Sequence, residues 1–234
     1  MSAIIRCRGV SKIYRQGLVD VPALRGVDLE IESGEFATLS GPSGSGKTTL
    51  LSLIGGLDRP SAGEILVDGE EITHLAAARL ADIRLKKIGF VFQTYSLIPV
   101  LSALENVEFI LRLLGRPAAA CSARAREMLH EVGLSGLEQR RPAQLSGGQQ
   151  QRVAVARALA PGPAIILADE PTANLDSANA EELIALIARL NAASGATFLI
   201  ATHDMRVVAH ARRRLGMVDG RITADERAGA PAAA

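Results

Sequence analysis

The sequence contains no tryptophan, and aromatic residues make up only 3% of its 234 residues. Hydrophobic residues nevertheless account for 48% of the chain, which is enough to bury a sizeable core. Because aromatic side chains are so scarce, this core is expected to be packed from Leu, Ile, Val and Ala. A chain of this length suits one large domain, or one domain with an inserted subdomain.

The chain also lacks an excess of charge and a closely spaced pair of cysteines. Lys and Arg number 26 against 25 Asp and Glu, for a formal net charge of +1. Nucleic-acid-binding proteins usually carry a basic excess or patch, so this balance argues against a nucleic-acid partner. Cys7 and Cys121 lie far apart and form no CxxC pair, which favours two inert thiols in a reducing compartment.

Long apolar runs are missing as well. No run approaches the roughly eighteen residues of a membrane span, and the first residues lack the apolar core of a signal peptide. Any role at a membrane is therefore expected to be peripheral.

Short apolar runs alternate with helical patterns, which predicts an α/β fold with a mostly parallel sheet. Residues 94–160 show helical spacing without a strand, and are predicted to form an inserted helical subdomain. The core and a β subdomain are predicted at about 1–93 and 161–222. Residues 1–226 are thus interpreted as a single domain, and the small and polar residues 223–234 as a disordered tail.

A glycine-rich segment, GPSGSGKT, matches the pattern G-x-x-x-x-G-K-[ST] between a predicted strand and a predicted helix. Its glycines let consecutive N–H groups surround phosphate oxygens, and the helix N-terminus adds partial positive charge. Lys47 can reach the β and γ phosphates, and the Thr48 hydroxyl can bind Mg²⁺. The strand–loop–helix context disfavours an ordinary glycine-rich turn. The predicted phosphate-binding residues are Gly41, Ser43, Gly44, Ser45, Gly46, Lys47, Thr48 and Thr49.

Two acidic residues close the apolar run IILADE. Ligands gather at the carboxyl edge of parallel strands, so this position suits a Mg²⁺·nucleotide. Asp169 is predicted to lie near the metal, and Glu170 to orient and deprotonate an attacking water. The alternative is that both acids cap the next helix. In a chain that also carries a phosphate loop, the catalytic interpretation is favoured.

A second serine–glycine helix start, LSGGQ, follows at residues 145–149. Together with the glycine loop and ILADEP, it resembles the nucleotide-binding domains of ABC transporters, with all motifs in family order. The resemblance implies a P-loop NTPase (RecA-like) core, an antiparallel β subdomain and the helical insert. It also implies hydrolysis of ATP with Mg²⁺.

The resemblance implies roles for four further residues. Tyr14, in a segment predicted to be a loop, matches the aromatic that stacks on adenine; the alternative is a half-buried tyrosine at a strand end. Gln93 matches the Q-loop glutamine that contacts Mg²⁺ or water, although it could be an ordinary polar strand cap. His203 matches the switch histidine at the γ-phosphate. Asp176 matches the D-loop aspartate that faces a second subunit.

In the family the LSGGQ segment completes a site on another molecule. The resemblance therefore implies a head-to-tail dimer of two copies, closed by ATP and opened by hydrolysis. It further implies an integral membrane permease that contacts the helical subdomain, and a cytoplasmic protein peripheral on the inner face of the cell membrane. The residues that would face the ATP of the second copy are Ser146, Gly147, Gly148 and Gln149.

Three longer stretches, GGLDRPSAGEI, FVFQTYSLIPVLSALENV and ADEPTANLD, are similar to one branch of the family. That branch contains the lipoprotein-release ATPase LolD, the macrolide exporter MacB and the cell-division ATPase FtsE. An export or lipoprotein-release system is favoured, with an FtsE-like regulator of cell-wall hydrolysis or an importer ATPase as alternatives. The apolar residues of 94–111 are expected either to form a groove for the permease or to pack internally.

Other classes explain less of the sequence. ABC ATPases of DNA repair insert a long coiled coil, and those of translation carry two cassettes; this chain shows neither. A P-loop kinase would leave LSGGQ and the switch histidine unexplained.

Overall fold

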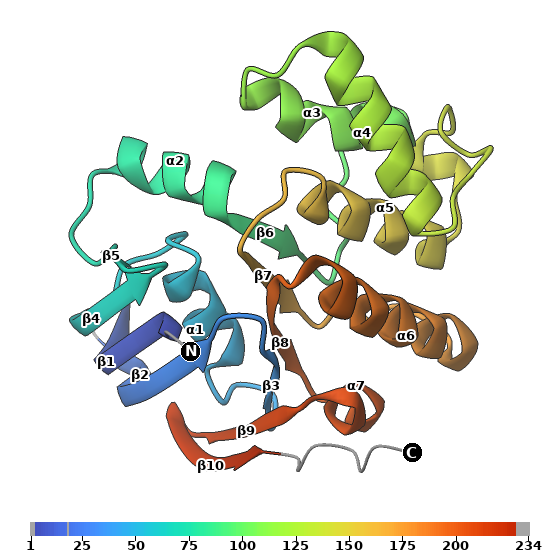
Figure 1. Ribbon diagram of the computed structural model, residues 1–234. Helices are drawn as coiled ribbons and strands as arrows, with labels where there is room; N and C mark the ends of the chain where they lie inside the picture. Colours follow the sequence, from blue (N-terminus) through green and yellow to red (C-terminus); the bar gives the residue numbers. More distant parts are fainter. Residues whose placement is uncertain (1–2, 18, 228–234) are drawn as a thin grey trace. The chain divides into compact units, whose positions relative to one another are not determined.

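The computed structural model describes residues 3–17 and 19–227 and divides the chain into two compact units (Figure 1). The first unit is Met1–Asp82 with Thr197–Ala234, and the second is Ile83–Ala196. The second unit extends beyond the helical subdomain expected at 94–160, because it also contains two strands and a long helix.

An antiparallel sheet in the first unit has the strand order β2-β1-β4-β5. Inward-facing aliphatic side chains alternate with exposed polar ones along β2, as expected for a half-buried strand. The strands are β1 (Ala3–Gln16), β2 (Val19–Glu32), β4 (Ala62–Val67) and β5 (Glu70–Glu71).

Tyr14 lies within β1 and not in a loop, so that prediction was wrong. The β1–β2 ladder continues to the tip of the hairpin, where Tyr14 pairs with Val21 and Gln16 with Val19. Polar residues and Gly17 give this segment the composition of a loop. The β-branched residues of β2 nevertheless allow an extended two-stranded ribbon.

The first unit also contains parallel strands around β3 (Phe36–Ser40). β3 pairs in parallel with β8 (Thr197–Thr202) and β9 (Arg213–Val218), which agrees with the predicted α/β fold. β10 (Arg221–Arg227) pairs antiparallel with β9.

β10 contradicts part of the predicted disordered tail. Residues 223–227 belong to this strand and pair with β9, and Asp225 forms a 2.8 Å ion pair with the largely buried Arg213. The prediction was therefore wrong over 223–227, where pairing and charge compensate for weak hydrophobicity. Residues 228–234 lie outside the described residues.

Two hairpins of the first unit turn through an Asp-Gly pair. Asp68 and Gly69 connect β4 to β5 with φ of 50° and 75°, and Asp219 and Gly220 connect β9 to β10 with φ of 46° and 75°. Such turns require positive φ at both central residues, which Asp-Gly supplies at low cost.

Helix α1 (Lys47–Ile54) has Gly55 as its C-cap. Two further helices, α2 (Ala77–Lys87) and α7 (Met205–His210), were not predicted. α2 is rich in charged residues and α7 is short, so neither shows a clear apolar periodicity.

The second unit contains a parallel strand pair and a group of helices. β6 and β7 pair in parallel, and every residue of β7 before its last is buried. Helices α3, α4 and α5 contact one another, so the predicted run of helices without a strand is confirmed (Figure 1). The elements are β6 (Ile88–Val91), α3 (Ala103–Leu113), α4 (Ala118–Glu131), a short 3₁₀ turn (Pro142–Gln144), α5 (Gly147–Leu159), β7 (Ile165–Asp169) and α6 (Ser177–Ser194).

Candidate nucleotide-binding site

The phosphate loop lies between β3 and α1, in the strand–loop–helix context that the motif predicted. Close packing makes two of its glycines, Gly41 and Gly46, obligatory. Gly46 has φ of 101°, and a Cβ there would lie 2.6 Å from the carbonyl oxygen of Ala23. A Cβ on Gly41 would lie 2.0 Å from the carbonyl oxygen of Met217. Neither neighbour is a flexible side chain, so the loop holds its shape only with glycine at these positions.

The side chain of Lys47 lies across this loop. It is 7% exposed, and its ammonium donates hydrogen bonds to the carbonyl oxygens of Gly41 (2.8 Å) and Pro42 (3.0 Å). The first turn of α1 contains no acidic residue, and its N-cap, Gly46, offers no side-chain acceptor. The N-terminal N–H groups of α1 and the Lys47 charge therefore make this end of the helix suitable for an anion.

Ser45 provides a test of whether a phosphate fits the loop. Its side-chain oxygen is buried and lacks a hydrogen-bond partner within residues 3–17 and 19–227. A buried hydroxyl without a partner is unfavourable, and a phosphate oxygen would satisfy it. The glycine backbone and the ammonium of Lys47 fit the same ligand, and the exposed Thr48 follows at the second position of α1.

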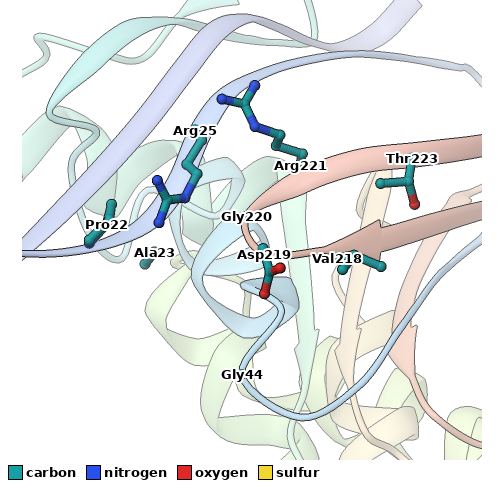
Figure 2. A pocket seen from close by; sticks show the side chains of 9 residues that line it. All are labelled: Pro22, Ala23, Arg25, Gly44, Val218, Asp219, Gly220, Arg221 and Thr223. Atoms are coloured by element: carbon teal, nitrogen blue, oxygen red, sulfur yellow. The ribbon is translucent and has the colours of Figure 1, made fainter.

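The β9–β10 turn is hydrogen-bonded to the backbone of the phosphate loop. The N–H of Gly220 donates to the carbonyl oxygen of Ser45 (3.0 Å), and the N–H of Arg25 donates to that of Gly220 (2.9 Å). Figure 2 shows this turn beside Gly44, at a pocket of about 530 Å³ whose lining also includes Arg25 and Arg221. The backbone of the phosphate loop is thus connected to both β2 and the closing hairpin.

Tyr14 and His203 are the other predicted site residues of the first unit. Tyr14 is 37% exposed, and its hydroxyl donates to Asp58 Oδ2 (2.9 Å). His203 is exposed and directly follows β8.

In the second unit, Asp169 is the last residue of β7, and Glu170 follows it in a strained conformation. Glu170 has φ of 46°, which costs a residue with a Cβ about 1–2 kcal/mol. Such strain often marks functional positions. The buried side chain of Gln151, on α5, donates to the carbonyl oxygen of Pro171 (2.9 Å), which fixes the segment directly after Glu170.

Gln93 is exposed just beyond β6, on a segment held by two residues that the sequence analysis missed. Asn174 donates a hydrogen bond to the carbonyl oxygen of Gln93 (2.9 Å). Arg157, on α5, donates to those of Tyr95 (3.0 Å) and Ser96 (2.6 Å), and burial lowers the pKa of this arginine. Tyr95 and Ser96 both have positive φ, at 59° and 49°. Arg157 therefore stabilises a strained turn directly after Gln93.

The LSGGQ segment begins α5 with a capping box. Ser146 Oγ accepts from the N–H of Gln149 (3.3 Å), and Gln149 Oε1 accepts from the N–H of Ser146 (3.0 Å). The amide of Gln149 thus has a structural role that the S-x-x-Q spacing could have revealed. Ser146 is exposed at this end of the helix.

Asp176 is the N-cap of α6, and its partner Asn179 also lies against Gly148 of the LSGGQ segment. Its carboxylate accepts from the N–H (2.9 Å) and the side-chain amide (2.7 Å) of Asn179. Hydrogen bonding from the backbone and then the side chain of Asn179 lowers the pKa of Asp176. A Cβ on Gly148 would lie 2.8 Å from Asn179 Oδ1, so this glycine permits the close approach.

Comparison with known proteins is consistent with this arrangement. Residues 24–173 match the family described as ABC transporter. An uncharacterized ABC transporter ATP-binding protein of Thermotoga maritima is 49% identical over 98% of this chain and 97% of its own. The lipoprotein-releasing system ATP-binding protein LolD of Chromohalobacter salexigens is 44% identical over 95% and 94%. The macrolide export ATP-binding/permease protein MacB 1/2 of Paracoccus denitrificans is 49% identical, but the match spans only 34% of that protein.

Solved structures extend the likeness to the fold. A dimeric post-hydrolysis state of the ATP-binding cassette MJ0796 bound to ADP and Pi superposes with a TM-score of 0.89, at 43% identity over 95% of this chain and 98% of that one. A second dimeric structure of this bacterial ABC transporter cassette gives the same TM-score at 44% identity. The chain therefore belongs to the ABC transporter family. Within that family it is an ATP-hydrolysing ATP-binding cassette. Within the described residues, no helix is long and apolar enough to cross a membrane.

Proposed function

We propose that this chain is the ATPase subunit that drives a separate membrane permease in an export or lipoprotein-release system. The observation that carries the proposal is the likeness to two relatives with these roles. The lipoprotein-releasing system ATP-binding protein LolD is 44% identical over 95% of this chain, and the macrolide export protein MacB 1/2 is 49% identical over 98% of it. In the proposed role the chain binds peripherally to the inner face of the cell membrane through its helical subdomain.

ATP is held by the phosphate loop and by the N-terminus of α1. The Lys47 ammonium moves from the carbonyl oxygens of Gly41 and Pro42 to the β and γ phosphates, where its charge is more strongly compensated. Ser45 donates its hydroxyl to a phosphate oxygen. Thr48, Asp169 and Gln93 are the residues that would hold Mg²⁺, which offsets phosphate charge when it is bound.

Hydrolysis depends on positioned polar groups. Glu170 accepts a proton from the attacking water, and the backbone strain at this residue fixes the direction of its carboxylate. His203 contacts the γ-phosphate and Gln93 helps to place the water. These three roles come from the match of the motifs to the family.

The exposed start of α5 completes the site of a second copy. Ser146 and the N–H groups of Gly147 and Gly148 present a helix N-terminus, which favours a triphosphate. ATP then binds the closed dimer better than the open one and shifts the population toward closure. The two solved cassette structures described above are dimeric.

Glu170→Gln tests the enzymatic part of the proposal. This variant should bind ATP, hydrolyse it very slowly and accumulate as a dimer in gel filtration with ATP. Rapid turnover by the variant would remove Glu170 from the proposed mechanism.

The same variant, held with ATP, tests the partner. Affinity purification from membranes should recover a permease with few membrane helices and a large extracytoplasmic domain. Recovery of a cell-division complex, or of an importer's permease, would overturn the proposed system in favour of those alternatives.

A further inference from the structure

The stretch GGLDRPSAGEI has a structural role that the proposed mechanism does not use. Its segment Asp58–Ser61 follows α1 and is bonded to β1 at several points. The N–H of Ser61 donates to the carbonyl oxygen of Ser11 (2.8 Å), and the N–H of Ile13 donates to Ser61 Oγ (3.0 Å). The segment is therefore fixed against the strand that carries Tyr14.

Asp58 is the central residue of this contact. Its Oδ2 accepts from the hydroxyl of Tyr14 (2.9 Å), and its Oδ1 accepts from the ammonium of Lys12 (2.8 Å) and the N–H of Arg59 (2.7 Å). Burial alone would raise the pKa of the Asp58 carboxyl, but the hydrogen bonds from Lys12, Arg59 and Tyr14 lower it. The carboxylate is therefore ionised at neutral pH and bonded at both oxygens.

Lys12 constrains the ring itself. Its ammonium lies over the Tyr14 ring, 4.9 Å from the centroid, and also donates to the carbonyl oxygen of Arg59 (2.6 Å). A cation over one face attracts the ring electrostatically and covers that face. The hydroxyl is bonded to Asp58 and one face is covered by Lys12, so the ring has a fixed direction, and the residue is still 37% exposed.

We propose that Asp58 is the positioning residue for Tyr14, holding its ring where the base of ATP stacks. Asp58 touches neither the base nor the phosphates, and acts through the Tyr14 hydroxyl. Because α1 connects Lys47 to the segment that carries Asp58, the same contact fixes the spacing between the base site and the phosphate site. This inference rests on the proposed binding of ATP.

The first test needs no nucleotide. The chain has two tyrosines and no tryptophan, so Tyr95→Phe leaves Tyr14 as its only tyrosine. Burial raises the pKa of Tyr14, as do the hydrogen bond to Asp58 and its charge, whereas a hydrogen bond with Thr49 lowers it. Absorbance titration of Tyr14 should therefore show a lower pKa in Asp58→Asn than in its parent. The control is Asp20→Asn, which removes a carboxylate from the tip of the same ribbon and should leave the titration nearly unchanged.

The second test uses ATP hydrolysis in the wild-type background. Asp58→Ala should raise KM for ATP about fivefold, the factor expected for one hydrogen bond, with little change in kcat. Asp58→Asn keeps an acceptor and should recover part of this loss. Tyr14→Phe should raise KM as much as Asp58→Ala does. The double variant should raise it no further, because both substitutions remove the same Tyr14–Asp58 hydrogen bond. Thermal unfolding of each variant separates positioning from loss of fold.

The outcomes distinguish this inference from the proposed function. If Tyr14→Ala raises KM but the Asp58 variants change neither KM nor the titration, Asp58 does not position Tyr14. If Asp58→Asn shifts the titration but Tyr14→Ala leaves KM unchanged, Tyr14 does not stack on the base. That result overturns both the positioning role and the proposed role of Tyr14.

Discussion

The ammonium of Lys47 lies 2.8 Å from the carbonyl oxygen of Gly41, so the residue expected to bind phosphate already lies over the loop that would surround it. The loop carbonyls hold this long side chain in place, which reduces the entropy lost when a phosphate arrives. Lys47→Ala should therefore abolish ATP hydrolysis and weaken binding of a fluorescent ATP analogue.

Mixing two inactive variants tests whether the start of α5 acts on a second copy. Ser146→Arg should block the segment that faces the partner's ATP, and Lys47→Ala should disable the phosphate loop. A mixed dimer then regains one intact site from two undamaged halves. ATP hydrolysis in the mixture should exceed the sum of the separate variants. Simple additivity would mean that Ser146 does not act in trans. A mixture of wild type with Lys47→Ala serves as the reference for subunit exchange.

The left-handed backbone at Glu170 predicts that glycine is more stable than alanine at this position, although either substitution removes the proposed catalytic carboxylate. Glu170→Gly should be inactive, yet its free energy of unfolding should exceed that of Glu170→Ala by about 1 kcal/mol, because glycine adopts this φ without strain. Urea unfolding of both variants measures the difference. Glu181, inside α6, serves as the control. There the order should reverse, and the free energy of unfolding of Glu181→Gly should be about 1 kcal/mol lower than that of Glu181→Ala. The same order at both positions would show that Glu170 is not strained.

Arg157 should control the order of the segment after Gln93. Arg157→Met keeps most of the side-chain volume but removes the donors to Tyr95 and Ser96. Because water can reach these partly exposed carbonyls, the expected loss in free energy of unfolding is about 1 kcal/mol per hydrogen bond. Hydrogen exchange monitored by mass spectrometry should show faster exchange in residues 94–97. Arg126→Met, at an exposed position on α4, should leave it unchanged. Equal protection in both variants would contradict the role of Arg157.

Cys7 should make stability sensitive to alkaline pH. Burial, and then the charge of Asp28, raises the pKa of Cys7 to about 12. The stabilisation from burying the neutral thiol is complete below the unfolded-state pKa of about 8.5 and is lost as pH rises toward the folded-state value. The free energy of unfolding of wild type, relative to that of Cys7→Ala, should thus fall by up to about 1.4 kcal/mol for each pH unit above 8.5. Urea unfolding at pH 8 and pH 10 measures it, and a constant difference would refute the shift.

Local chemistry made much of the fold predictable from the sequence. Asp-Gly turns, the glycine loop and the apolar run before Asp169 each specify their structure within a few residues. Contacts between distant residues were not predictable in this way. The ribbon that carries Tyr14 depends on pairing with β2, and β10 depends on pairing with β9. The supporting residues Asp58 and Arg157 bind partners far along the chain, Tyr14 and Tyr95. Asn179 binds the nearby Asp176, but its approach to Gly148 joins segments that are distant in the sequence. The roles of the site residues in binding and catalysis remain predictions.

The bond from Gly220 to the carbonyl oxygen of Ser45 has a consequence for the order of assembly during synthesis. The phosphate loop, before α1, leaves the ribosome well before the β9–β10 turn that supports it. Folding of distant contacts must wait for both partners. A nascent chain that ends before β9 should therefore lack a finished nucleotide site, so ATP could not engage the protein until the β9–β10 turn had been made.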